Sequence, residues 1–225
     1  VLALLGLPTD TFVHVAFGML RMAEGKLSTR KGQIIFMEDV LNEAVTLARK
    51  IIDKKNPDLT DKDAVAKQIG IGAVVFGDLV NDRNRDVLFD WDKILDFEGD
   101  TGPYVQYTHA RASSLLAKAG RDVGWKSGVT IDATHLNQPE EHALVRSLDG
   151  FSGAINQSMQ QYKPHHVAQH LLQLCRAFNM FYHACPVLTA QSAELRNARL
   201  ALVEAARQVI RNGLWLLNVA APDEM

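Results

Sequence analysis

A basic segment bracketed by glycines is the first part of the sequence whose residue types suggest chemistry. Residues 25–32 read Gly-Lys-Leu-Ser-Thr-Arg-Lys-Gly, which places three cations and two hydroxyls in a short loop. Such a loop could hold phosphates, but a Walker loop needs four residues between its glycines and Ser or Thr directly after Lys. Here six residues separate Gly18 from Gly25, and Leu27 follows Lys26. We therefore reject a Walker loop, and a solvated basic turn stays an open alternative.

Histidine and cysteine spacing suggests a metal site at first sight. His166 and His170 stand at i, i+4 on an expected helix, within reach of one metal ion. No Glu, Asp or Cys nearby completes the ligand set, and Cys175 and Cys185 would lie about 15 Å apart on a helix. We therefore predict no protein-bound metal, polar histidines on the helix surface, and Cys175 packed as a small apolar residue.

Composition allows a folded core and excludes few classes of protein. The 225 residues are 47% apolar and 22% charged, which suits one large or two small globular domains. Charges interrupt every apolar run of membrane-spanning length, no secretory segment is visible, and only two cysteines occur, so we expect a cytoplasmic protein without membrane contact. Residues 1–100 have a formal net charge of −4 and residues 101–225 one of +2. Neither part is strongly basic, so any RNA contact must come from local basic patches. The chain opens at Val1 inside an apolar run, so we expect a piece of a longer protein.

Helices are expected to position most of these residues. Residues 12–22 read as an extended segment, residues 38–54 as a helix that suits its dipole, and the chain is mainly helical after Asp61. Pro164 suits the start of a later helix, and Gly213 suits the end of the last one. The expected apolar stripes are Val167, Leu171, Leu174, Phe178 and Phe181 on the first of these two helices, and Leu195, Ala198, Leu202, Ala205 and Val209 on the second.

Four arginines of the last helix have two interpretations. At about 100° per residue they fall within about 120° of arc, roughly opposite the expected apolar stripe. They form either a solvated face or a stripe that binds an RNA backbone, because Arg matches phosphate oxygens. These residues are Arg196, Arg199, Arg207 and Arg211.

One long motif identifies a family. Residues 99–111 read Gly-Asp-Thr-Gly-Pro-Tyr-Val-Gln-Tyr-Thr-His-Ala-Arg, which resembles the segment that opens the anticodon-binding domain of arginyl-tRNA synthetases. The resemblance covers essentially the whole chain, and its other carriers are residues 14–20, 89–92, 97–98, 178–182 and 221–225. It implies a mainly α fold: a small α/β remnant of the catalytic domain over residues 1–34, a helical connector over 35–100, and an all-α anticodon-binding bundle over 101–225.

The resemblance also gives the basic loop a role. Residues 26–32 resemble the mobile Lys-x-Ser-type signature loop of class I synthetases, although Thr29 stands where the family has its second Lys. Cations there would stabilise the charge that develops as pyrophosphate leaves ATP. The implied catalytic residues are Lys26, Ser28, Arg30 and Lys31, and the implied ATP-binding residues are Gly18, Met19, Leu20 and Leu27.

The anticodon contacts are expected on the bundle. Tyr104, Tyr107 and Arg111 would share one helix face, about a third of a turn from a core face that includes Val105. Exposed rings can stack on unstacked bases, although both tyrosines could instead be half-buried and bond inside the bundle. The resemblance implies anticodon-loop contacts on the motif of residues 99–111, in the region of Tyr182 and at Met225. The expected tRNA-binding residues are Tyr104, Tyr107, Arg111, Asn179, Tyr182, Arg207 and Met225.

The resemblance implies part of an arginine-tRNA ligase, which joins arginine to tRNA-Arg with ATP, and with Mg²⁺ as the counter-ion of ATP. The expected partners are tRNA-Arg, ATP and arginine, and we expect a monomer. No His-x-Gly-His element occurs in the sequence, so the chain by itself should not activate arginine. The alternative is a non-catalytic RNA-binding or scaffolding module that retains the bundle.

Overall fold

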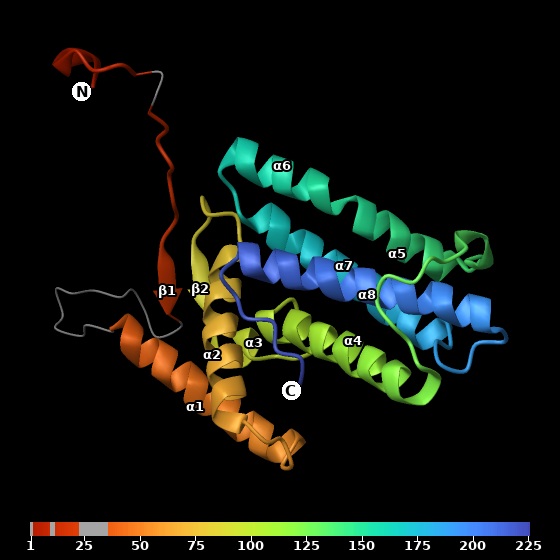
Figure 1. The fold of residues 1–225 in the computed structure, drawn as a ribbon. Coiled ribbons are helices and arrows are strands. Elements are labelled where there is room, and N and C mark those ends of the chain that lie inside the picture. Colours follow the sequence, from red (N-terminus) through yellow and green to blue (C-terminus); the bar gives the residue numbers. More distant parts are fainter. Residues whose placement is uncertain (1, 10–11, 23–35) are drawn as a thin grey trace.

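The computed structural model describes residues 2–9, 12–22 and 36–225. Helices dominate this part of the chain, and two short strands pair in parallel, which confirms a mainly α fold with a small α/β part (Figure 1). In chain order the elements are η1 (Ala3–Leu5), β1 (Leu20–Met22), α1 (Met37–Lys55), α2 (Lys62–Leu79), β2 (Val87–Phe89), α3 (Trp91–Ile94), α4 (Gly102–Val123), η3 (Ala133–His135), α5 (Pro139–Asp149), α6 (Phe151–Gln161), α7 (His165–Ala184) and α8 (Ala193–Leu216).

The helix ends follow local sequence signals. Helix α1 has Glu38 in its first turn and Lys55 in its last, which suits the helix dipole. Helix α4 begins after Thr101, whose hydroxyl accepts a hydrogen bond from Tyr104 N at 3.2 Å, and it ends at Gly124 in the left-handed conformation with φ of 67°. Both ends of α4, which carries the motif of residues 99–111, are therefore fixed by the sequence itself.

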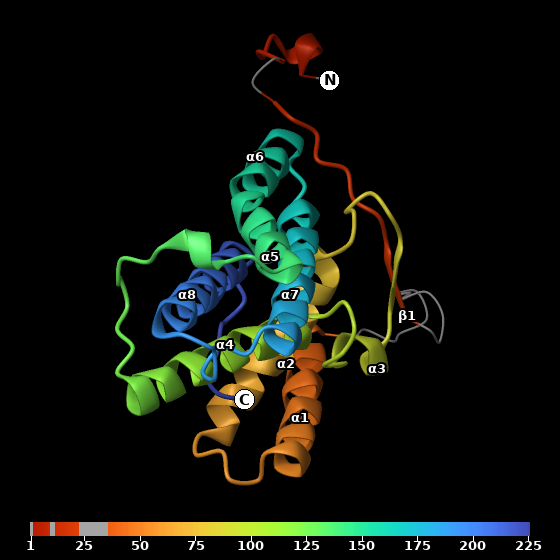
Figure 2. The same ribbon diagram turned by 90° about the vertical axis from the view of Figure 1, so that its right-hand side faces the viewer.

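Helices α1 and α2 form a close pair with a small apolar core of its own, which also includes Leu59 and Leu95. Gly70 permits the close approach, because a Cβ atom there would lie 2.6 Å from Val45 N. Figure 2 shows this pair at one end of the molecule and α5 to α8 at the other, with α4 between them. The motif helix thus joins the α1–α2 pair to α7 and α8.

The strands β1 and β2 pair with Leu20 opposite Val87, and no further strand occurs in the described ranges. Residues 12–19, which precede β1, form neither helix nor strand and run beside the rest of the molecule (Figures 1 and 2). The apolar side chains of this segment are largely exposed, and Phe17 is an example.

The main core lies among α4, α5, α7 and α8. The predicted stripe of α7 is confirmed, because Val167, Leu171, Leu174, Phe178 and Phe181 are all buried there. Cys175 is also fully buried in this core, as expected, and burial raises the pKa of its thiol to about 12.

The predicted stripe of α8 is confirmed at Ala198 and Leu202, which are buried, but it is wrong at Ala205, because the buried face is rotated by part of a turn. Ala205 is exposed, whereas Val203, Ile210 and Leu214 are fully buried. The predicted stop at Gly213 is also wrong, because α8 continues to Leu216. Gly213 instead permits close packing of α8 on α7: a Cβ atom there would lie 2.5 Å from a methyl carbon of Leu171.

The four arginines of α8 do not form one solvated face. Arg199 is buried and donates from Nε to a carboxylate oxygen of Glu141 at 2.7 Å and from Nη1 to the carbonyl of Pro186 at 2.7 Å. Glu141 is fully buried and also accepts a hydrogen bond from Gln138 N at 2.8 Å. Both interpretations of the four arginines therefore fail at Arg199, because a buried ion pair has replaced water or RNA there. Arg211 is exposed, as expected.

Candidate functional site

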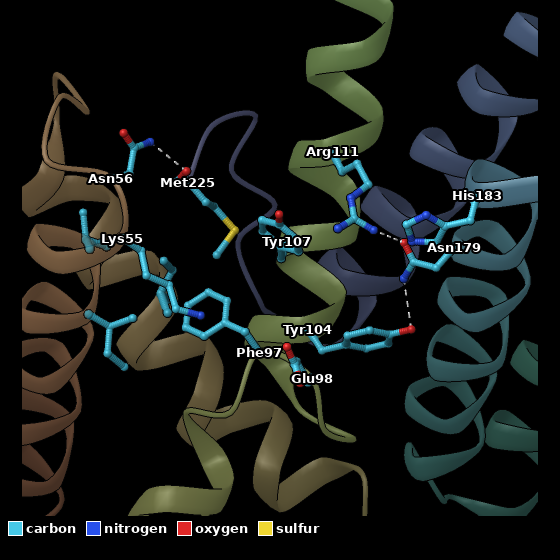
Figure 3. Close-up of a pocket in the computed structure, with 13 residues that line it drawn as sticks. Lys55, Asn56, Phe97, Glu98, Tyr104, Tyr107, Arg111, Asn179, His183 and Met225 are labelled. Atoms are coloured by element: carbon cyan, nitrogen blue, oxygen red, sulfur yellow. Dashed lines mark hydrogen bonds between the residues drawn. The ribbon is translucent and has the colours of Figure 1, made fainter. Parts of the chain in front are cut away.

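A pocket of about 660 Å³ lies where the α1–α2 pair meets α4 and α7 (Figure 3). Five of the seven predicted tRNA-binding residues line it, although they are as far apart in sequence as Tyr104 and Met225. Its wall consists of Ile51, Ile52, Lys55, Asn56, Ile69, Phe97, Glu98, Tyr104, Tyr107, Arg111, Asn179, His183 and Met225.

Arg111 lies between two aromatic rings. Its guanidinium carbon is 4.8 Å from the ring centre of Tyr107 and 5.2 Å from that of Tyr182, and the group also donates to the side-chain oxygen of Asn179. Tyr107 is 40% exposed and Tyr182 is 36% exposed, so both rings also reach solvent. Cation–π contacts therefore hold a positive charge at the mouth of the pocket beside accessible aromatic surface.

Tyr104 lies deeper than Tyr107. Its ring packs in part against the main core, and its hydroxyl accepts a hydrogen bond from the Asn179 side-chain nitrogen at 3.0 Å. Burial raises the pKa of this phenol above its ordinary value. The alternative of an internal hydrogen bond thus fits Tyr104, whereas Tyr107 has the accessible ring that base stacking needs. The core face expected beside them is confirmed at Val105, which is fully buried.

Asn179 connects α7 to α4 at the pocket. Its side-chain nitrogen also lies 3.4 Å from the hydroxyl oxygen of Thr108, so one amide contacts Tyr104, Thr108 and Arg111. This network fixes the relative position of the two helices that carry the pocket's polar groups.

Sequence reasoning missed the α1 side of the pocket. The Lys55 ammonium lies 4.9 Å from the ring centre of Phe97, and that ring meets Tyr107 edge-on with centres 6.4 Å apart. The side-chain nitrogen of Asn56 donates to the Met225 carbonyl at 2.9 Å. Residues 97–98 were part of the family resemblance, but nothing in the sequence placed Lys55 opposite them.

Arg207 is not part of this pocket. It lines a separate hollow together with Ser113, Trp125 and Asp223. If RNA contacts Arg207, it does so outside the group formed by the other predicted contacts.

The ATP side is described only in part. Lys26, Leu27, Ser28, Arg30 and Lys31 lie outside the described residues.

The predicted ATP-binding residues Gly18, Met19 and Leu20 are held against β2 and the segment that leads into it. Gly18 N donates to the Arg83 carbonyl at 2.6 Å, and Met19 N donates to the Asp86 carboxylate at 2.8 Å. A Cβ atom on Gly18 would lie 2.2 Å from the Arg85 carbonyl oxygen, so only glycine permits this approach. The backbone of residues 18–20 is therefore well anchored.

No group of three possible metal-binding side chains occurs in residues 2–9, 12–22 and 36–225. His166 contacts the Gln161 side-chain oxygen at 3.0 Å, and the His170 ring lies against Phe151 with centres 5.9 Å apart. Both histidines are half-buried rather than freely exposed. None of the described helices is long and apolar enough to cross a membrane.

Comparisons with known proteins agree with this arrangement. Residues 105–225 match the DALR anticodon binding domain, and residues 7–91 match the catalytic domain of class I tRNA synthetases (R). Arginine–tRNA ligase of Clostridium acetobutylicum is 46% identical over 213 residues, covering 95% of this chain and 37% of that protein. The enzyme of Clostridium botulinum is 45% identical, covering 96% and 38%. This chain thus spans well under half the length of these curated relatives.

Solved structures give the same result. The Thermus thermophilus arginyl-tRNA synthetase superposes with a TM-score of 0.89 at 36% identity, covering 100% of this chain and 38% of that one. The Plasmodium falciparum enzyme shares the fold, with a TM-score of 0.74 at 20% identity over 94% of this chain and 35% of that one. The chain therefore belongs to the arginyl-tRNA synthetase family and carries its DALR anticodon-binding domain.

Proposed function

We propose that the whole protein is an arginine-tRNA ligase, which forms arginyl-adenylate from arginine and ATP and transfers the arginine to tRNA-Arg. This chain supplies two parts of that activity: the recognition of the anticodon loop and the loop that contacts the ATP phosphates. The family assignment over residues 7–91 and 105–225 supports both parts. The proposed division is a catalytic remnant over residues 1–34, a connector over 35–100 and the anticodon-binding bundle over 101–225.

The pocket between α1 and α4 carries the proposal for RNA. Tyr107 and Tyr182 offer accessible rings, and Arg111 between them offers several N–H donors in one plane. Bases of a single-stranded loop stack on such rings, and a guanidinium matches phosphate or base-edge oxygens. Asn179 and Met225 would complete the contact, with Tyr104 holding Asn179 in place.

The ATP side rests on the signature-loop resemblance. Gly18, Met19 and Leu20 would contact the nucleotide, and Lys26 would approach its phosphates together with the other cations of the loop. Mg²⁺ would arrive as the counter-ion of ATP, so no metal held by the protein is proposed. A cytoplasmic monomer is the simplest setting for this activity.

The test of the RNA site is a titration of tRNA-Arg at fixed salt with the Tyr107→Ala variant of the whole protein. Stacking is worth about 1–3 kcal/mol per base, so the affinity should fall about tenfold or more. The Tyr107→Phe variant retains the ring and should bind like the parent. Tyr162→Ala is the matched control, because this exposed tyrosine lies at the end of α6, outside the pocket.

Two results would count against the proposal. Unchanged affinity of Tyr107→Ala, or a melting temperature that collapses with it, would assign the ring to the core instead. A whole protein that binds tRNA-Arg but forms no arginyl-adenylate would be the non-catalytic RNA-binding module.

A further inference from the structure

Residues 217–225, called the strap here, follow α8 without forming a helix or strand. The chain reverses at Asn218, whose φ of 57° is left-handed, and Val219 N donates back to the Leu214 carbonyl at 2.8 Å. The strap then passes α2 and α4 and ends beside the pocket (Figure 1). It connects the end of α8 to a site that α8 does not reach.

Three buried polar side chains of α4 bind the strap in order. Gln106 donates to the Ala220 carbonyl at 2.8 Å, and it also donates to the Gln68 carbonyl of α2 at 3.1 Å. His109 Nδ1 lies 2.9 Å from the Pro222 carbonyl, which can only accept, so Nδ1 carries the proton.

The third contact is from the Ser113 hydroxyl to the Asp223 carboxylate, at 2.7 Å. The three α4 residues stand at i, i+3 and i+7, so they share one face of the helix. All three side chains are buried. A buried polar group without a partner lowers the stability of a fold, so the strap provides hydrogen-bond acceptors that these α4 side chains require.

Glycine and apolar contacts set the depth of the strap. A Cβ atom on Gly72 of α2 would lie 2.7 Å from the Gln106 side-chain nitrogen and 3.0 Å from a Val219 methyl carbon. Val219 is buried, as is Pro222. Helix α2, helix α4 and the strap therefore pack together without room for adjustment at this point.

The end of the strap forms one wall of the pocket. Asn56 donates to the Met225 carbonyl at 2.9 Å, and the Met225 side chain packs against the small core of α1 and α2 (Figure 3). Met225 lines the same pocket as Tyr107 and Arg111, but it is the one lining residue that lies on the strap. Its position depends on how firmly the preceding residues are held.

We infer that Gln106, His109 and Ser113 are positioning residues for tRNA binding, which act by fixing the strap so that Met225 completes the pocket. They do not touch the RNA. This inference rests on the proposed anticodon site and adds to it a set of residues on another face of α4. With the strap released, the pocket would lose one wall and would have to order the strap at each binding event.

The test uses the whole protein with His109→Phe, which retains an aromatic ring but cannot donate to Pro222. The KM and Kd for tRNA-Arg should rise about three- to tenfold, the range expected for one net hydrogen bond, while kcat at saturating tRNA stays within about twofold. Amide hydrogen exchange of residues 219–225 should accelerate in the absence of RNA. His170→Phe is the matched control, because it makes the same change at a half-buried histidine that does not touch the strap.

A double-mutant cycle with Met225→Ala separates positioning from general destabilisation. If His109 acts through Met225, adding His109→Phe to Met225→Ala should weaken tRNA binding little further. Additive effects would overturn the inference, and so would an unchanged KM together with accelerated exchange. Should His109→Phe fail to fold, Ser113→Ala removes only the bond to Asp223 and is expected to act in the same direction.

The outcomes for the two proposals differ. If Tyr107→Ala and Met225→Ala both leave tRNA binding unchanged, the anticodon site is wrong and the positioning role falls with it. If they weaken binding and His109→Phe does not, only the positioning role is refuted.

Discussion

Replacing Arg199 with Met should destabilise the folded chain by about 3–5 kcal/mol, the usual cost of removing one partner from a buried ion pair. The Arg199 side chain is 7% exposed and that of Glu141 is fully buried, so water cannot replace the lost guanidinium. After the substitution the carboxylate retains the hydrogen bond from Gln138 N, and the Pro186 carbonyl loses the one from Arg199. The charge left on Glu141 dominates the expected loss.

The double variant Glu141→Met and Arg199→Met should recover much of that stability. It removes both buried charges, but it also removes the hydrogen bond that Gln138 N donates to Glu141 at the start of α5 and the one that Arg199 donates to Pro186. A lost helix cap costs about 1 kcal/mol and a lost hydrogen bond about 0.5–1.5 kcal/mol. The free energy of unfolding of the double variant should therefore be about 1–3 kcal/mol lower than that of the parent. This loss is much smaller than the sum of the losses in the two single variants.

Urea unfolding followed by far-ultraviolet circular dichroism measures these differences. Arg211→Met is the control, because Arg211 is exposed on the same helix and its loss should cost less than about 0.5 kcal/mol. A cost below about 1 kcal/mol for Arg199→Met would show that the ion pair is solvated or dispensable. Additive single variants would show that the two charges do not depend on each other.

Three further predictions concern activity and pH. Lys26→Ala in the whole protein should slow arginine activation about 10²–10³-fold, and far more than it weakens tRNA-Arg binding; an unchanged activation rate would leave the loop a basic turn. The 225-residue chain alone should show no arginine-dependent ATP–pyrophosphate exchange with tRNA-Arg present, because it lacks a His-x-Gly-His element. Burial lowers the pKa of His109, His165 and His170, so the unfolded chain binds more protons than the folded chain at mildly acidic pH. The stability should therefore fall as the pH drops below about 6.5. Urea midpoints measured from about pH 8 to about pH 5.5 would show this fall, and a flat profile would contradict it.

The sequence predicted α7 better than α8 for a physical reason. Large side chains such as Phe178 define the stripe of α7, and a large apolar residue has one favourable side of a helix. The predicted stripe of α8 depended on Ala198 and Ala205, and alanine fits a core, a surface or a close contact equally well. The face expected opposite this stripe included Arg199, which is in fact buried and paired with Glu141.

Only part of the pocket could be predicted from the sequence. Family resemblance named Tyr107, Arg111 and Met225, and the fold brings them together. The α1 side could not be predicted, because it depends on contacts such as the hydrogen bond from Asn56 to Met225, which are 169 residues apart in the sequence. No periodicity within one helix carries that information. The basic end of α1 already had a sufficient explanation in the helix dipole, so Lys55 raised no question.

Helix α4 explains why the motif of residues 99–111 takes part in several different contacts of the structure. At about 100° per residue its first turns present three distinct faces, and each face meets a different part of the molecule. The pocket face holds Tyr104, Tyr107 and Arg111, the core face Val105, Ala112 and Leu116, and the strap face Gln106, His109 and Ser113.

The three faces should respond differently to substitution. A change on the core face should lower stability, and a change on the pocket face should weaken tRNA binding without a comparable loss of stability. A change on the strap face should weaken tRNA binding only while Met225 is present. This dependence on Met225 is the decisive test. It would show that α4 does more than support the pocket, because it also fixes the position of a lining residue that lies on the strap.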